Sequence, residues 1–188
     1  ASENLIFGQH ACDMEAYNAT LHPFIRNTVG CMEFGGVFLN KRMNRGNDGG
    51  TTRRTTDVFQ LATAVLFQNP IQNFALAPNN LQDAPQVCLD FMKEVPTEWD
   101  EVRYIDGYPG KYVVLARRHG EKWYVAAVNA GKETLKLNAD LSFLGEKVVS
   151  WYADDKNLQP QMQEKKLKAG KPTQLVIAPQ GGVVLVTE

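Results

Sequence analysis

A chain of 188 residues with 44% apolar and 22% charged residues can fold around a core, which excludes a disordered or fibrous protein. Twenty basic against 21 acidic residues leave a net charge of −1, without the positive charge that nucleic acid or an anionic membrane attracts. No apolar run approaches the roughly 20 residues that span a bilayer. We therefore expect neither nucleic acid nor a membrane as a partner.

The first half alternates strand and helix signals. Short apolar runs at residues 5–7, 31–34 and 71–76 predict three strands. A helix is expected to begin near Pro23, and a long loop rich in glycine and basic residues occupies 35–54. The order is a βα unit repeated three times, which predicts parallel strands and an α/β fold.

Two helices of this half are well marked. Thr56 offers a capping hydroxyl, and apolar residues from Val58 to Val65 recur at helical spacing. The next helix opens at 83–85 and is predicted to bury Cys88, Phe91, Met92 and Val95.

The hydrophobic period changes after residue 97. Short β-branched or aromatic runs separated by turn clusters predict an antiparallel β domain, a sandwich or a meander. These runs lie at 112–117, 123–128, 134–137, 148–152, 175–178 and 183–186. We therefore predict two domains, 1–97 and 98–188, with Trp99 and either Tyr104 or Tyr108 buried where they join.

The candidates for chemistry are polar side chains at the ends of the predicted parallel strands, where barrel enzymes keep their active sites. Glu15 follows the first strand, Glu33 ends the second, and Asn79 and Asn80 follow the third. Any one of these acids can instead be a helix cap or a solvated side chain. Arg53 and Arg54 are interpreted as solvated.

Five stretches resemble, in order, the C-terminal portion of glycoside hydrolase family 97, which comprises bacterial α-glucosidases and α-galactosidases. They are MEAYN at 14–18, PFIRN at 23–27, TTD at 55–57, VPTEWDE at 95–101 and DGYPGKYVV at 106–114. The resemblance implies the last three βα units of a (β/α)₈ barrel followed by an antiparallel β-sandwich-like domain. It agrees with the α/β plus all-β order inferred from the residues.

The resemblance also implies site residues. Glu15 matches the family's catalytic acid, which also helps to ligate an active-site Ca²⁺, and Gln9 stands where some members have a further metal-binding acid. Glu33, in place of a more usual Asp, and Asn79 are expected to bind substrate.

The implied function is the C-terminal part of a glycosidase that cleaves α-linked glucosides or galactosides. Its partners would be an oligosaccharide and the N-terminal remainder of the same enzyme, which supplies the second carboxylate. The resemblance implies a periplasmic or secreted bacterial protein, and the isolated chain is expected to be inactive. The alternatives are a non-catalytic carbohydrate-binding or structural β module, and a free-standing small α/β domain with an appended sheet.

Overall fold

The computed structural model describes residues 8–42, 44, 46, 48–76 and 81–188. The helices and strands of the first half are α1 (Gln9–Ala19), α2 (Arg26–Val29), β1 (Phe34–Gly36), α3 (Asp57–Leu66), β2 (Gln72–Phe74) and α4 (Gln86–Glu94). β1 and β2 pair in parallel, with Phe34 opposite Gln72. The parallel pairing predicted for the second and third strands is therefore confirmed, whereas the first predicted strand, 5–7, lies outside the described residues.

α1 is a helix where the sequence predicts a strand exit. Its buried residues Cys12, Ala16 and Ala19 have helical spacing, but they are too small to give a strong apolar signal. The helix expected near Pro23 is α2, which begins three residues later. Glu15 therefore lies within a helix and not in a loop after a strand.

α3 is the helix that the capping pattern predicts. Thr56 is its N-cap, and the Thr56 hydroxyl accepts a hydrogen bond of 3.1 Å from the backbone N–H of Phe59. All ten residues of α3 are buried, including the polar Asp57, Gln60 and Thr63, so the helix has no solvent-exposed face. The predicted stripe of Cys88, Phe91, Met92 and Val95 is buried, which confirms that prediction for α4 and its C-cap.

The second half is an antiparallel β fold, as predicted, so that the chain as a whole is mostly antiparallel sheet with few helices. A six-stranded sheet has the order β3-β4-β5-β10-β7-β8, and β6 and β9 form a separate ribbon. The strands are β3 (Glu101–Tyr108), β4 (Tyr112–His119), β5 (Lys122–Asn129), β6 (Leu135–Ala139), β7 (Val148–Asp154), β8 (Pro160–Lys166), β9 (Thr173–Ile177) and β10 (Gly182–Thr187).

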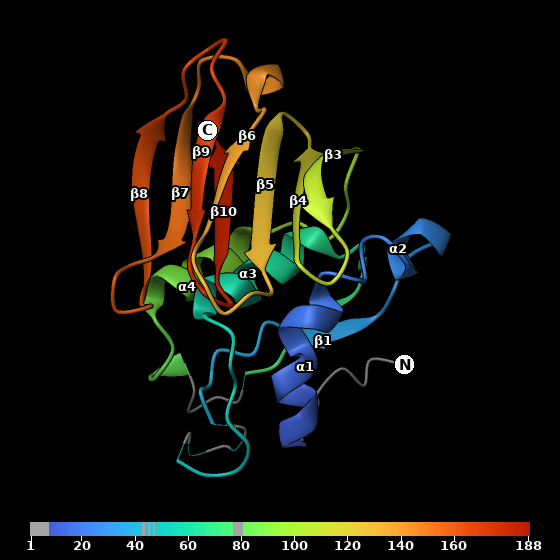
Figure 1. Ribbon diagram of the computed structural model, residues 1–188, viewed down its shortest axis with the longest axis vertical. Helices are drawn as coiled ribbons and strands as arrows, with labels where there is room; N and C mark the ends of the chain where they lie inside the picture. Colours follow the sequence, from blue (N-terminus) through green and yellow to red (C-terminus); the bar gives the residue numbers. More distant parts are fainter. Residues whose placement is uncertain (1–7, 43, 45, 47, 77–80) are drawn as a thin grey trace.

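The six-stranded sheet is the middle layer of three (Figure 1). Val113 and Leu115 of β4 share a core with α3 and α4, whereas Val114 and Ala116 share the opposite core with the β6–β9 ribbon. β5 and β10 alternate in the same way between the two cores. Burial on both faces explains why these strands read as continuous apolar runs.

The two edge strands of the sheet, β3 and β8, are the strands that the sequence analysis misses. Both are largely exposed, and β3 carries an irregularity between Tyr104 and Asp106. An edge strand has no sheet neighbour on one side and is selected for polar residues and bulges, so its hydrophobic pattern is weak.

The position of β3 also corrects the prediction for the join. Tyr104 and Tyr108 are each 58% exposed, so the expectation that one of them is buried between the halves is wrong. Trp99 is half-buried and meets the Tyr124 ring edge-on, with 5.3 Å between ring centroids. Both tyrosines lie on the edge strand β3, which has a neighbouring strand on one side only, so their rings remain in contact with solvent.

Candidate functional site

Glu15 lies midway along α1, and both of its carboxylate oxygens accept hydrogen bonds. The Thr55 hydroxyl donates to Oε2 at 2.9 Å, and the Gln60 side-chain amide donates to Oε1 at 2.6 Å. The same amide nitrogen donates to the Thr55 hydroxyl at 2.8 Å. The three side chains thus form a closed ring of hydrogen bonds, called here the Glu15 ring. It holds the carboxylate between α1 and the first turns of α3.

The Glu15 ring lies on the side of the molecule where β1 ends. The Gln60 side-chain oxygen accepts a hydrogen bond of 3.0 Å from the backbone N–H of Phe38, two residues after β1. Parallel-strand enzymes keep their chemistry at the carboxyl ends of strands. Glu15 is therefore placed where a catalytic group is expected, and its catalytic role stays a prediction.

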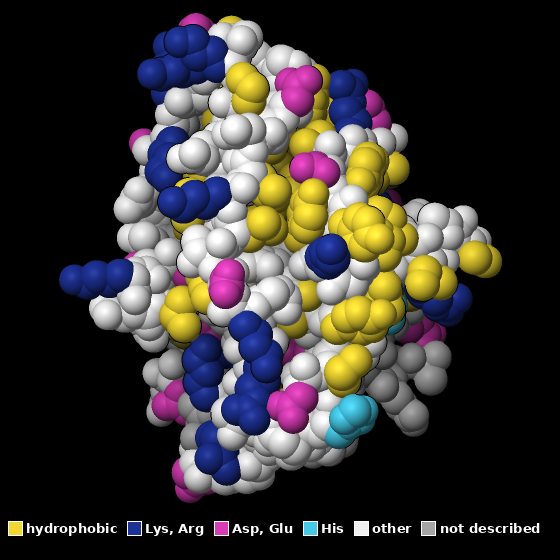
Figure 2. Space-filling model, viewed as in Figure 1, with side chains coloured by type: hydrophobic (Ala, Val, Ile, Leu, Met, Phe, Trp, Pro, Cys, Tyr) yellow, Lys and Arg dark blue, Asp and Glu magenta, His cyan; other side chains and the backbone are white. Residues whose placement is uncertain are grey.

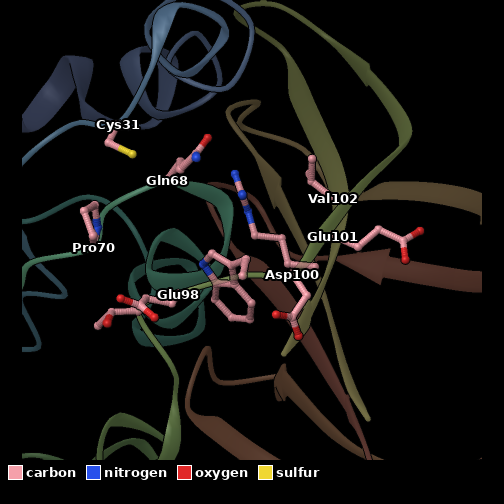
Figure 3. Close-up of a pocket in the computed structure, with 10 residues that line it drawn as sticks. Cys31, Gln68, Pro70, Glu98, Asp100, Glu101 and Val102 are labelled. Carbon is pink, nitrogen blue, oxygen red and sulfur yellow. The ribbon is translucent and has the colours of Figure 1, made fainter. Parts of the chain in front are cut away.

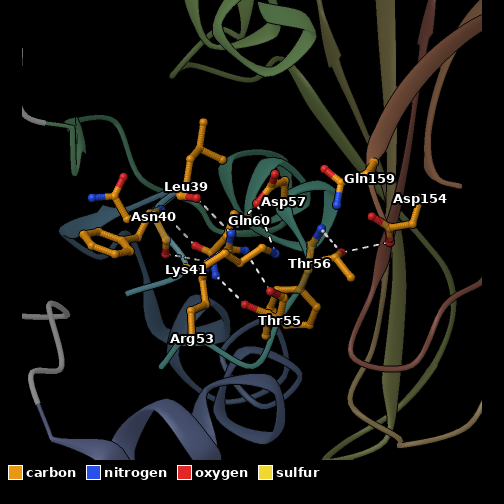
Figure 4. Close-up of polar contacts among 12 residues, drawn as sticks. Leu39, Asn40, Lys41, Arg53, Thr55, Thr56, Asp57, Gln60, Asp154 and Gln159 are labelled. Carbon is orange, nitrogen blue, oxygen red and sulfur yellow. Dashed lines mark hydrogen bonds and ion pairs between the residues drawn. The ribbon is translucent and has the colours of Figure 1, made fainter. Parts of the chain in front are cut away.

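Beside this ring lies a buried ion pair (Figure 4). The Arg53 side chain is 1% exposed and is paired with Asp57, the first residue of α3, whose side chain is 6% exposed. Arg53 also donates to the backbone carbonyls of Leu39, Asn40 and Thr55 at 2.7–3.1 Å. The interpretation of Arg53 as solvated is wrong, because the residue holds the two ends of the 39–55 loop together.

Lys41 and Asp154 extend this charged cluster. Lys41 Nζ lies 3.5 Å from Asp57 Oδ1, and burial, followed by the charge of Arg53, lowers the pKa of Lys41. The Thr56 hydroxyl donates to Oδ2 of Asp154, at the end of β7, at 2.8 Å. Burial raises the pKa of Asp154 from 3.8 to about 6. The cluster therefore ties the start of α3 to the antiparallel sheet.

Gln9, the second predicted metal ligand, is occupied by other contacts. Its side-chain oxygen accepts a hydrogen bond from the backbone N–H of Thr52 at 3.0 Å, and its amide donates to the Thr52 carbonyl at 3.1 Å. Six residues of helix separate Gln9 from Glu15, a rise of about 9 Å with the side chains on different faces. Ca²⁺ ligands lie only 2.3–2.6 Å from the ion. α1 therefore does not present these two side chains to one ion.

Glu33, a predicted substrate-binding residue, is not among the side chains bonded to Glu15. Glu33 immediately precedes β1, at the opposite end of that strand from Phe38. Asn79 and Asn80 lie outside the described residues. Thr55, Gln60 and Asp154 are the functional candidates that the sequence analysis misses. Only the TTD motif at 55–57 signals this region, because a buried Gln or Asp is indistinguishable from an exposed one in the sequence.

No helix in the described part of the chain is long and apolar enough to cross a membrane. The same residues contain no group of three or more His, Cys, Asp and Glu side chains arranged to hold a metal ion.

Comparisons with known proteins agree with one another. Residues 98–188 match the family described as "Glycosyl-hydrolase 97 C-terminal, oligomerisation". A retaining alpha-galactosidase of Bacteroides thetaiotaomicron is 32% identical over 150 residues, which cover 77% of this chain and 22% of that protein. The crystal structure of a beta-arabinopyranosidase is 67% identical with a TM-score of 0.95, and covers 99% of this chain and 30% of that one.

A further similar structure is a family 97 glycoside hydrolase of Pseudoalteromonas sp. strain K8, in complex with panose. It is 26% identical with a TM-score of 0.77, and the match covers 96% of this chain and 30% of that one. The chain therefore spans less than a third of the length of these relatives.

Proposed function

This chain is a C-terminal portion of a family 97 glycoside hydrolase, and we propose that the longer enzyme hydrolyses β-L-arabinopyranosides and α-D-galactopyranosides with retention of configuration. The single observation that carries the proposal is the 67% identity to a beta-arabinopyranosidase over 99% of the chain. The two substrates share the configuration of their ring carbons C1 to C4 and differ by the hydroxymethyl group at C5. The similarity to a retaining alpha-galactosidase supports the second substrate and the stereochemistry.

In this proposal the first half of the chain is the last part of a (β/α)₈ barrel, whose earlier strands belong to the upstream remainder of the enzyme. Glu15 is the general acid that gives its proton to the leaving glycosidic oxygen. Thr55 and Gln60 hold its carboxylate, and each carboxylate oxygen has about two lone-pair sites, so the ring of hydrogen bonds leaves room for the proton. The nucleophilic carboxylate of a retaining enzyme lies about 5–5.5 Å from the acid. It comes from the upstream part, so the isolated chain is expected to be inactive.

Calcium remains an expectation from the resemblance. Because the Gln9 side chain is bonded to the backbone of Thr52, we do not assign it as a ligand, and the residue roles proposed here are those of the chain's own side chains. Export to the periplasm or out of the cell is likewise proposed from the resemblance alone.

A substrate series tests the proposal. The full-length enzyme is assayed on p-nitrophenyl β-L-arabinopyranoside, α-D-galactopyranoside and α-D-glucopyranoside. The first two are expected to exceed the glucoside in kcat/KM by at least about 10-fold, because only the glucoside has an equatorial 4-hydroxyl that leaves polar groups of the site unpaired. A preference for the glucoside would contradict the proposed substrate class.

The role of Glu15 is tested by Glu15→Gln in the full-length enzyme. Cleavage of an unactivated disaccharide should fall by about 10²–10⁴-fold, while aryl glycosides, whose leaving groups need little protonation, should fall much less. Glu164→Gln is the matched control and should leave both rates near wild type, because Glu164 is an exposed residue of the edge strand β8. A Glu15→Gln enzyme that cleaves the disaccharide at the wild-type rate would remove Glu15 from the mechanism.

The alternative, a carbohydrate-binding β module, has one observation in its favour. Tyr104 and Tyr108 expose their rings on β3, where a sugar could stack. Affinity electrophoresis of the full-length enzyme in galactan and arabinan gels tests this alternative. Retardation that disappears in Tyr104→Ala/Tyr108→Ala would support a binding module, and unchanged mobility of the wild type would exclude it for these glycans.

A further inference from the structure

A pocket of about 410 Å³ lies where the two halves of the chain meet, remote from the Glu15 ring. Figure 3 shows Cys31, Gln68 and Pro70 of the first half on one side of the pocket, and Asp100, Glu101 and Val102 of the second half on the other. Arg117 and Trp99 also line it. Its volume is sufficient for a monosaccharide.

The pocket lies at the opposite end of α3 from the Glu15 ring. Gln68 follows the last residue of α3, whereas Gln60 and Thr55 lie at its start. Ten residues of helix separate the two ends by about 15 Å. A ligand in the pocket would therefore not contact Glu15.

Arg117, on β4, is a buried cation without an acidic partner among the described residues. It is 4% exposed, and its hydrogen bond within that part of the chain is the one from Nη2 to the Leu66 carbonyl at 3.1 Å. Its Nε is buried and unpaired. Buried charges are normally paired, because leaving one unpaired costs several kcal/mol. The described part of the chain therefore supplies no anionic partner to Arg117, and a bound ligand could supply one.

Trp99 supplies a second unpaired donor to the same pocket. Its indole Nε1 is buried and has no hydrogen-bond partner among the described residues. Buried polar groups are hydrogen-bonded in the great majority of cases. The two unpaired groups are both donors, so they complement a ligand that brings acceptor oxygens.

The rim of the pocket is acidic but largely neutralised. Asp100 and Glu101 each lie 3.4 Å from Arg118, and Glu101 is also paired with Arg103 at 2.7 Å. Glu98 is exposed and forms no ion pair with the described residues. These carboxylates and the Gln68 amide can accept hydrogen bonds from hydroxyl groups.

We propose that this pocket binds a uronic acid residue, with its carboxylate on Arg117 and Trp99 and its hydroxyls on the rim. A uronate brings an anionic acceptor at one end and hydroxyl donors at the other. The choice of a sugar rests on the proposed function, whereas the choice of an anion rests on Arg117 and Trp99 alone. The site would hold an acidic branch of a polysaccharide whose neutral sugars the enzyme removes.

The test compares two ligands of the same ring, methyl β-D-galacturonide and methyl β-D-galactoside, by isothermal titration calorimetry with the full-length enzyme at pH 7. Both have the anomeric configuration opposite to the proposed substrates, which disfavours the hydrolytic site. The galacturonide is expected to bind about 10–100-fold more tightly, because it alone brings a carboxylate that can form an ion pair with Arg117.

Three variants and one control assign the binding to the pocket. Arg117→Met should reduce galacturonide affinity by at least about 10-fold, and Trp99→Phe, which retains an aromatic ring but removes the indole N–H, by about 5-fold. Lys136→Gln is the matched control, since it removes one exposed positive charge on β6 and should leave binding unchanged. Glu98→Gln should tighten binding, because it removes the unpaired acid of the rim. If circular dichroism shows that Arg117→Met does not fold, the galacturonide affinities of Trp99→Phe and Glu98→Gln test whether the ligand binds in the pocket.

Three results would overturn the proposal. The first is equal binding of the galactoside, or no binding of either ligand. The second is competition by inorganic phosphate at equal concentration, which would make the pocket a general anion site. The third is a structure of the longer enzyme with an upstream carboxylate paired to Arg117. Hydrolysis of p-nitrophenyl β-L-arabinopyranoside by the variants is expected to stay within about twofold of wild type. Failure of hydrolysis in the wild type would instead count against the proposed function.

Discussion

Arg53 and Arg54 are neighbours in the chain, yet their surroundings are opposite. Arg53 is buried with Asp57 and three backbone carbonyls, whereas Arg54 pairs with Asp13 at 2.8 Å while both side chains are nearly half exposed. The value of an ion pair depends on this difference, because a buried charge that loses its partner cannot return to water. The two arginines therefore form a matched pair for mutation.

Arg53→Met is expected to lower the free energy of unfolding by about 3–5 kcal/mol, because it leaves Asp57 buried with Lys41 as its one cationic partner among the described residues. Arg54→Met should leave the free energy of unfolding close to wild type, since water solvates Asp13. Urea denaturation of both variants measures the difference. Equal effects would contradict the structural role assigned to Arg53.

Asp154 makes stability depend on pH. Its pKa is about 6 in the folded protein against 3.8 ordinarily, so the folded state binds the proton more tightly than the unfolded state. Stability should therefore be unaffected by this group below pH 4, fall between pH 4 and 6, and remain lower by up to about 3 kcal/mol above that range. In Asp154→Asn this loss should disappear, so that the variant gains stability relative to wild type at pH 7 but not at pH 4. Urea denaturation of both proteins at pH 4 and pH 7 measures whether the stability difference between Asp154→Asn and wild type has this sign.

At the scale of elements, the hairpin between β3 and β4 holds α1. Gly110, in this turn, has a φ of +78°, and a Cβ there would lie 2.6 Å from the Tyr17 ring of α1. The Phe24 ring, after α1, meets Tyr104 of β3 edge-on at 6.0 Å. Figure 2 shows hydrophobic side chains gathered on this side of the molecule, over the hairpin and the first helices. The hairpin therefore helps to position the helix that carries Glu15.

Gly110→Ala should destabilise the protein more than Gly120→Ala. Both glycines have a positive φ, which costs alanine about 1–2 kcal/mol, but a Cβ at Gly120 would meet nothing within 4 Å. In Gly110→Ala the clash with Tyr17 should destabilise the folded protein by about a further 1–3 kcal/mol. It should also lower kcat in the full-length enzyme by displacing α1. Denaturation and kinetics of both variants are compared, and equal results would show that the hairpin does not position α1.

At the scale of the whole molecule, one core joins the helices to the sheet. Phe59 and Val65 of α3 belong to the same buried cluster as Ala126 and Val128 of β5. The predicted division at residue 97 thus separates segments that bury one another's apolar surface.

Residues 98–188 expressed alone should therefore aggregate or bind hydrophobic dyes, because one apolar face of the sheet is uncovered. Residues 57–188 retain α3 and α4, which cover that face of the sheet, and should show neither aggregation nor strong dye binding. Light scattering and dye fluorescence of the two fragments test this expectation. A well-behaved 98–188 fragment would show that the β half folds independently.

The amino-acid sequence determines the elements with the most apolar residues. α4 follows from its helical stripe, α3 from helical spacing and the Thr56 cap, and the central strands β4, β5 and β10 from continuous apolar runs. The sequence also carries the resemblance to family 97, because motifs in order do not depend on contacts.

Only the tertiary structure decides what surrounds a polar side chain. It buries Arg53 and leaves Arg54 in water, joins Glu15 to Thr55 and Gln60 across 40 and 45 residues of chain, and leaves Arg117 without an acidic partner among the described residues. It also places the edge strands β3 and β8, whose one-sided exposure weakens their pattern. The physical reason is the same in each case: local periodicity reports which face of an element is buried, whereas charge pairing and solvation depend on segments brought together by folding.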